Sequence, residues 1–90
     1  MITLQDCIDM GGLTDDLVNV IADHEHLPSI VAMELGETLL ASPAGRAMIR
    51  RYLDEDLAAA LRSGDRRGVI RAQRNLERLS DCFGAADAGA

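Results

Sequence analysis

The sequence has no lysine and no tryptophan, and Tyr52 and Phe83 are its only aromatic residues among 90. The core must therefore be built from aliphatic side chains, which come from the 48% of the chain that is apolar. Aliphatic side chains suit the packing of helix on helix better than a β-sandwich, which favours β-branched and aromatic residues. The same shortage argues against stacking of bases on aromatic rings, the usual means of holding single-stranded nucleic acid.

No apolar run approaches the roughly 20 residues that a membrane-spanning helix needs, and the first residues lack the basic start of a signal peptide. These absences predict a cytoplasmic protein with no membrane partner. The two cysteines, Cys7 and Cys82, have neither a Cys-x-x-Cys spacing nor the Cys/His spacing of a zinc site. In a reducing compartment we expect both to be free thiols.

Motifs of covalent catalysis are also missing. There is no Gly-x-Ser-x-Gly sequence, and neither cysteine has a histidine close to it along the chain. The pair Gly11-Gly12 is better explained as a helix terminator than as a phosphate-binding loop. We therefore predict no catalytic residues, no enzymatic activity and no cofactor.

What the chain does have is a divided charge distribution. Residues 1–45 carry eight acidic side chains and no basic one, whereas all nine arginines lie between Arg46 and Arg78. The net charge of -6 is thus the sum of an acidic half and a basic half. Two explanations stay open: the halves attract each other, within one bundle or across a dimer, or the basic face binds an anionic partner.

Capping residues and prolines divide the chain into helices. Thr3 begins a short first helix that ends at Gly11-Gly12. Thr14 is placed to cap a second helix, which should end near His26, because Pro28 disfavours helical geometry at the residue before it. Pro28 itself suits the first position of a third helix, since its missing N–H would be unpaired there in any case.

The third helix runs to Leu40 and is apolar around most of its circumference, so we expect it to be central in the fold. A fourth helix, with Ser42 as its cap and Pro43 as its first residue, runs to Arg62. The turn Ser63-Gly64-Asp65 closes it and caps a last helix over residues 66–83. The predicted core includes four leucines, Leu35, Leu39, Leu57 and Leu76.

These elements predict an all-α fold, a compact bundle of four to five helices ending in an αα-hairpin. Residues 1–83 form a single helical domain, because a chain this short cannot divide its apolar residues between two cores. Residues 84–90, rich in alanine and glycine, form a tail that should fray.

The segment Asp23-His24-Glu25-His26 contains the only two histidines of the chain. In a continuous helix, residues two apart point about 200° away from each other, so the two rings could not share a metal ion. In an extended segment they could, and Glu34 or Glu37 could then complete a site for zinc, iron or manganese.

The interpretation that we favour for these histidines needs no metal. His24 continues the apolar face of its helix and packs inward, while His26 is exposed at the helix end. Asp56 lies on the inner side of the fourth helix, and a partly buried carboxylate needs a partner such as His24 or an arginine. We therefore expect His24 to hydrogen-bond to Asp56 or to a backbone carbonyl.

The last helix is strongly amphipathic, with Val69, Ala72, Leu76 and Leu79 on one face. The opposite face carries an arginine stripe, Arg67, Arg71, Arg74 and Arg78. Such a stripe can meet a row of phosphates or carboxylates, but the acidic character of the whole chain argues against nucleic acid. We interpret the stripe as a solvated or subunit-contacting face.

The stretch Ile21-Ala22-Asp23-His24-Glu25-His26-Leu27-Pro28-Ser29-Ile30-Val31-Ala32-Met33-Glu34-Leu35-Gly36 resembles a segment of short uncharacterised bacterial helical proteins. Those proteins share an acidic-His-Glu-His-apolar-Pro core, followed by an apolar helix and an arginine-bearing hairpin. The resemblance covers about the first four-fifths of the chain. It implies a small all-helical fold and assigns neither an activity nor a functional residue.

Taken as a whole, the sequence predicts a non-enzymatic interaction or regulatory module that self-associates as a homodimer. Its predicted contact residues are Arg67, Arg71, Arg74, Arg78, His24 and His26. Two alternatives stay open. One is a small metal-binding protein that uses the His24/His26 junction, and the other is a nucleic-acid-associated factor that uses the arginine stripe.

Overall fold

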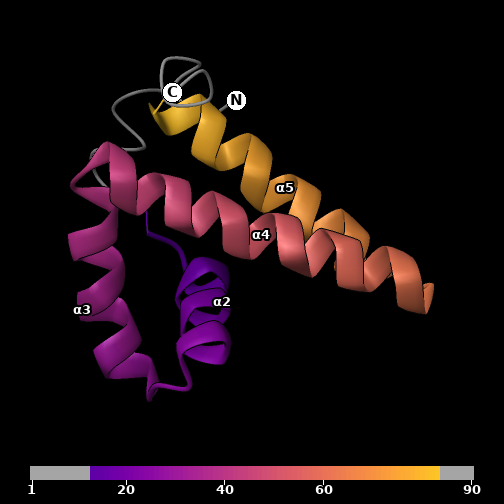
Figure 1. Ribbon diagram of the computed structural model, residues 1–90, viewed down its shortest axis with the longest axis horizontal. Coiled ribbons are helices and arrows are strands. Elements are labelled where there is room, and N and C mark those ends of the chain that lie inside the picture. The colour runs from indigo at the N-terminus through magenta and orange to yellow at the C-terminus, as the bar shows by residue number, and fades with distance from the viewer. Residues whose placement is uncertain (1–12, 84–90) are drawn as a thin grey trace.

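The computed structural model describes residues 13–83, which form four helices joined by short turns (Figure 1). The helices are α2 (Asp15–Glu25), α3 (Ser29–Leu40), α4 (Pro43–Ser63) and α5 (Arg66–Phe83). The predicted all-α class is confirmed, and these four helices begin and end within one or two residues of the predicted positions. The predicted short first helix and the predicted frayed tail lie outside the described residues.

Helix α4 is the longest element, and the other three helices pack against it (Figure 1). Helices α2 and α3 run antiparallel to each other beside the first part of α4, while α5 folds back along α4 as the predicted αα-hairpin. Within residues 13–83, no helix combines the length and the apolar character that crossing a bilayer requires.

Three of the predicted helix caps are confirmed. The side-chain oxygens of Thr14, Ser42 and Asp65 accept hydrogen bonds from the backbone N–H three residues later, at 3.2, 3.1 and 3.1 Å. Gly64 closes α4 with a φ of 71°, a left-handed conformation that glycine adopts without strain. Pro28 lies one position earlier than predicted, because its extended ψ of 153° makes it the cap of α3 and not the first helical residue.

The core is centred on Ile21 of α2 and on Ile49 and Leu53 of α4, the three largest side chains that are fully buried. The four leucines predicted to be buried, Leu35, Leu39, Leu57 and Leu76, are only half-buried. The difference has a geometric cause at the hairpin. There α4 and α5 approach through small residues, so that a Cβ added to Gly68 would lie 3.0 Å from the Cβ of Ala60.

The expectation that α3 is central is wrong. It turns three small or medium residues to the core, Ala32, Gly36 and Leu40. Gly36 allows close approach to α2, because a Cβ at this position would lie 3.1 Å from Cδ1 of Ile21. Packing through small residues leaves large apolar side chains of α3 in solvent, with Ile30 71% exposed.

Cys82, in the last turn of α5, is disulfide-bonded. The expectation of a free thiol at this position is therefore wrong, and Cys7 lies outside the described residues. Because disulfides are rare in the reducing cytosol, this bond does not fit the expected cytoplasmic location.

Two leucines one turn apart on α4 test the position of the core. Leu53 is fully buried and Leu57 is half-buried. We expect Leu53→Ala to lower the free energy of unfolding by about 2–5 kcal/mol, and Leu57→Ala to lower it by clearly less, because fewer contacts are removed. Urea denaturation of both variants measures the two costs. If Leu57→Ala lowers the free energy of unfolding as much as Leu53→Ala, or more, the core is not centred on Leu53.

Candidate functional site at the histidine junction

The two histidines lie on different kinds of backbone. Helix α2 continues through Glu25, and His26 then ends it with a φ of 55°, in the left-handed region. The side chain of His24 faces α4 and is 20% exposed, whereas His26 is exposed to solvent. The predicted end of α2 near His26 is confirmed, and so is the inward position of His24.

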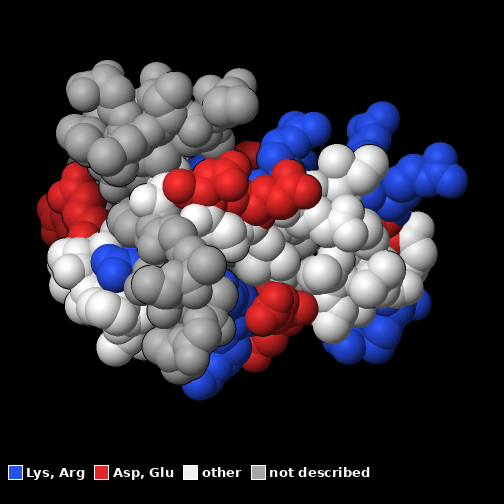
Figure 2. Space-filling model, turned by 90° about the horizontal axis from the view of Figure 1, so that it is seen from above, with Lys and Arg blue, Asp and Glu red and all other residues white. Residues whose placement is uncertain are grey.

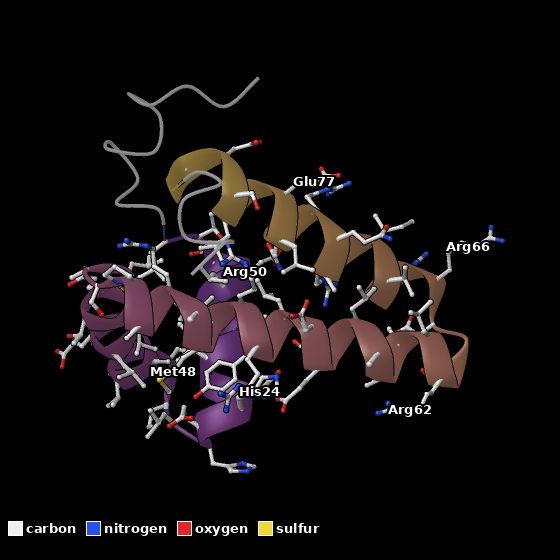
Figure 3. The ribbon with its side chains drawn as sticks, turned by 45° about the horizontal axis from the view of Figure 1, so that its top comes forward. His24, Met48, Arg50, Arg62, Arg66 and Glu77 are labelled. Carbon is white, nitrogen blue, oxygen red and sulfur yellow. The ribbon has the colours of Figure 1, made fainter. Side chains whose placement is uncertain are left out.

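Three side chains of α4 contact the ring of His24, which is labelled in Figure 3. Its Nε2 lies 2.8 Å from Oδ1 of Asp56, and its Nδ1 lies 3.6 Å from Oε2 of Glu55. The ring of Tyr52 stacks on it, with centroids 4.6 Å apart and planes 11° from parallel. The predicted hydrogen bond between His24 and Asp56 is therefore confirmed.

A second contact lies beside the first. The hydroxyl of Tyr52 donates a hydrogen bond to Oε2 of Glu25, the last residue of α2. This hydrogen bond, together with burial and the nearby carboxylate charge, raises the pKa of Tyr52. Two successive residues at the end of α2 are thus held by one turn of α4.

We call this set of side chains the α2–α4 clamp: His24 and Glu25 on α2, with Tyr52, Glu55 and Asp56 on α4. Sequence reasoning found two of the five members and missed the other three. For two of the missed residues, Tyr52 and Glu55, the signal was their spacing from Asp56, because positions 52, 55 and 56 are i, i+3 and i+4 on a helix and so share one face.

The geometry of the clamp does not suit the metal hypothesis. A shared ion needed an extended backbone at the two histidines, but the chain is helical through Glu25. Glu34 and Glu37, the other suggested ligands, are exposed on α3. Among residues 13–83 no group of three or more His, Cys, Asp or Glu side chains is placed to hold a metal ion.

The arginine stripe of α5 lies largely in solvent. Arg67, Arg71 and Arg74 are exposed, whereas Arg78 is half-buried. The exposed three surround a shallow hollow together with Asp16, from the first turn of α2. The acidic start of α2 therefore faces the basic helix, as expected if the two halves attract each other within one bundle.

On each of α3 and α5, exposed apolar side chains lie among exposed charged ones. The α3 surface consists of Ile30, Val31, Met33, Glu34 and Glu37, all exposed. The α5 surface consists of Arg66, Arg67, Ile70 and Arg74, also all exposed. The two surfaces share an apolar component and carry charges of opposite sign.

Comparisons with known proteins add no assignment: the chain matches no family model, and no curated protein or solved structure is significantly similar to it. The resemblance to short bacterial helical proteins therefore stays a prediction.

The two histidines provide a matched test of the clamp. We expect His24→Ala to lower the free energy of unfolding by about 1–3 kcal/mol, because it removes a hydrogen bond to a carboxylate and an aromatic stack. His26→Gly should leave stability unchanged or raise it by up to ~1 kcal/mol, since glycine tolerates the positive φ. Thermal and urea denaturation report both values. A neutral His24→Ala would mean that the contacts of His24 in the clamp contribute nothing to stability.

Tyr52 is the only tyrosine, so its phenol can be titrated without interference. We expect its pKa to lie above the ordinary value of 10.0, because the hydrogen bond to Glu25 stabilises the neutral hydroxyl. Since the pKa is higher in the folded than in the unfolded state, the stabilisation is fully present below pH 10.0 and is lost as the pH rises through the folded-state pKa.

Ultraviolet absorbance of the phenolate follows this titration directly. Glu25→Gln removes the carboxylate acceptor and should move the pKa of Tyr52 back toward 10.0. A wild-type midpoint at or below this value, or one that Glu25→Gln leaves in place, would contradict the hydrogen bond.

Proposed function

We propose that this protein is a non-enzymatic interaction module that self-associates, with the α3 surface of one copy packed on the α5 surface of another. One observation carries the proposal. Both surfaces expose apolar side chains, and the charged residues around these side chains are acidic on α3 and basic on α5. The histidine His24 takes no part in this contact, because the clamp holds it against α4.

The α3 surface is the more apolar of the two. Ile30 is 71% exposed, and Val31 and Met33 are also exposed. Large apolar side chains gain about 1.5–3 kcal/mol each when fully buried, so a partner that covers this surface gains appreciable free energy. Contiguous exposed apolar side chains rimmed by charges are typical of protein-interaction sites.

Charge selects the partner. Glu34 lies one helical turn from Ile30, and Glu37 one turn from Met33, so the apolar side chains of α3 are flanked by carboxylates. On α5 the apolar Ile70 has arginines at i−4, i−3 and i+4. A second copy of the same chain therefore offers the complement to each surface, and in a two-fold pair each contact is made twice.

The distribution of charge on one face of the molecule supports the same pairing. On the face seen in Figure 2, the arginines gather mainly around the end where α4 joins α5, whereas the acidic side chains occupy the middle and the other end. Two copies placed side by side with opposite directions bring unlike charges together. Copies placed in the same direction bring like charges together, which is disfavoured.

Two other candidate functions have less support. The metal-binding alternative lacks the backbone geometry at His24 and His26 that it needs. Nucleic-acid binding is less well supported, because Asp16 and Asp65 lie beside the arginines and counteract their charge. A cytoplasmic location stays a prediction, and the disulfide at Cys82 argues against it.

Sedimentation equilibrium over a range of protein concentrations tests the proposal. We expect a monomer–dimer equilibrium that weakens when salt is raised to about 1 M, where the Debye length is only ~3 Å. Ile30→Ser should weaken it by at least about tenfold, since a buried isoleucine is worth more than about 1.4 kcal/mol. The reducing agent should be varied, so that a covalent dimer is not counted. A monomer at every concentration would refute the proposal.

Charge reversal provides the matched controls. Arg67→Glu with Arg74→Glu should weaken the dimer, whereas Arg51→Glu with Arg62→Glu changes the net charge equally at exposed α4 positions outside both surfaces and should have little effect. Adding Glu34→Arg and Glu37→Arg to the first pair restores the complementarity and should restore the dimer. If the two pairs weaken association equally, the effect is one of net charge, and the assigned surfaces are wrong.

A further inference from the structure

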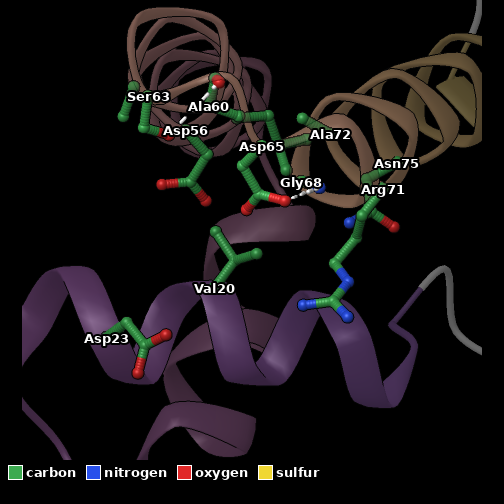
Figure 4. A pocket seen from close by; sticks show the side chains of 12 residues that line it. Val20, Asp23, Asp56, Ala60, Ser63, Asp65, Gly68, Arg71, Ala72 and Asn75 are labelled. Carbon is green, nitrogen blue, oxygen red and sulfur yellow. Dashed lines mark hydrogen bonds between the residues drawn. The ribbon is translucent and has the colours of Figure 1, made fainter.

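A cavity of about 300 Å³ lies between α2, α4 and α5, apart from the α3 surface and the α5 surface (Figure 4). Its size is at the lower end of the roughly 300–1,000 Å³ that ligand-binding cavities occupy in proteins. Apolar side chains form part of its wall, among them Val20 of α2, Leu53 of α4 and Ala72 of α5. A small molecule with an aliphatic segment would fit such a wall.

The polar groups of the cavity are of two kinds. Three carboxylates line it, from Asp23 on α2, Asp56 on α4 and Asp65 in the turn between α4 and α5. The α5 side contributes the guanidinium of Arg71, which extends toward α2 in Figure 4. The lining therefore carries three negative charges and one positive charge.

Asn75 is the residue of the cavity lining whose side chain most needs a partner. It is the one buried polar residue of the described core, at 6% exposure, and it lines the cavity. Its amide nitrogen Nδ2 is buried without a hydrogen-bond partner among the described residues. Leaving such a donor unpaired is unfavourable, and each example in a folded protein calls for an explanation. In Figure 4 the side chain lies beside Arg71.

We propose that this cavity binds a small aliphatic amino acid with a basic side chain. The carboxylate of the ligand accepts hydrogen bonds from Nδ2 of Asn75 and from the guanidinium of Arg71, the two donors of the α5 side. Its ammonium groups pair with the carboxylates of Asp23, Asp56 and Asp65. Its methylene chain packs on the apolar wall.

The charge of the lining selects this class of ligand. Three aspartates and one arginine leave an excess of two negative charges. A molecule with two ammonium groups and one carboxylate offsets part of that excess and also gives Asn75 and Arg71 an acceptor. A simple diamine would leave both donors unpaired, and a simple fatty acid would meet three carboxylates with no cation.

Nuclear magnetic resonance of the full chain, titrated with L-lysine, tests the proposal. We expect saturable shifts at the side-chain amide of Asn75 and at the backbone amide of Gly68, another residue of the lining, with a Kd of about 1 mM or below. Cadaverine, which is lysine without its carboxylate, should bind at least about tenfold more weakly, and hexanoate should not bind. Absence of saturable shifts with L-lysine, or equal binding of cadaverine, would overturn the proposal.

Substitutions separate a binding role from a structural one. Arg71→Gln should weaken L-lysine binding by at least about tenfold, since a charge-assisted hydrogen bond is lost. Arg62→Gln, at an exposed position of α4 outside the cavity lining and outside both surfaces, is the matched control and should leave the Kd unchanged. An equal effect of both substitutions would mean that only overall charge matters.

Asn75→Leu gives the sharpest result. It removes the unpaired donor at similar volume, so the thermal midpoint of the free protein should stay the same or rise, while L-lysine binding is lost. If Asn75 has only a structural role, Asn75→Leu should instead lower the thermal midpoint. The protein that still folds should then bind L-lysine with an unchanged Kd. These readouts do not depend on self-association, and so they hold whether or not the dimer forms.

Discussion

The contact between the last turn of α2 and the middle of α4 joins α2 to the α4–α5 hairpin through side-chain hydrogen bonds. His24 and Glu25 are the last two residues of α2, and both bind side chains of one turn of α4. Because the chain turns sharply at His26 and Pro28, the direction of α2 determines where α3 begins. The clamp thus places the α3 surface relative to the α4–α5 hairpin.

Asp56 connects the clamp to the cavity. Its Oδ1 accepts the hydrogen bond of His24, and its carboxylate also lines the space between α2, α4 and α5. Helix α2 contributes Val20 and Asp23 to the same wall. A shift of α2 on α4 would therefore affect the core, the cavity and the position of α3 together, because α2 contacts all three.

Local features of the fold could be predicted well from the sequence. Thr14, Ser42 and Asp65 act as caps through bonds that span only three residues, so their role follows from nearby sequence alone. The pairing of His24 with Asp56 was predictable for a different reason. Each residue is polar on an otherwise apolar helix face, and such groups need partners when the faces meet.

The features that depend on how closely the helices approach could not be predicted. The apolar circumference of α3 suggested a central helix, but Ala32 and Gly36 are the residues that allow close packing, and they decide which face turns inward. Asn75 was missed because it shares a face with Ala72 and Leu79, and only the packed structure shows that its amide is enclosed.

A double-mutant cycle between His24 and Asp56 tests most directly whether the clamp holds α2 on α4. The free energies of unfolding of the wild type, His24→Ala, Asp56→Ala and the double variant give the coupling between the two side chains, free of their other contacts. If the clamp holds the two helices together, the coupling should be about 1 kcal/mol or more in favour of the pair. A coupling near zero would contradict this role, because the two side chains would then contribute to stability independently.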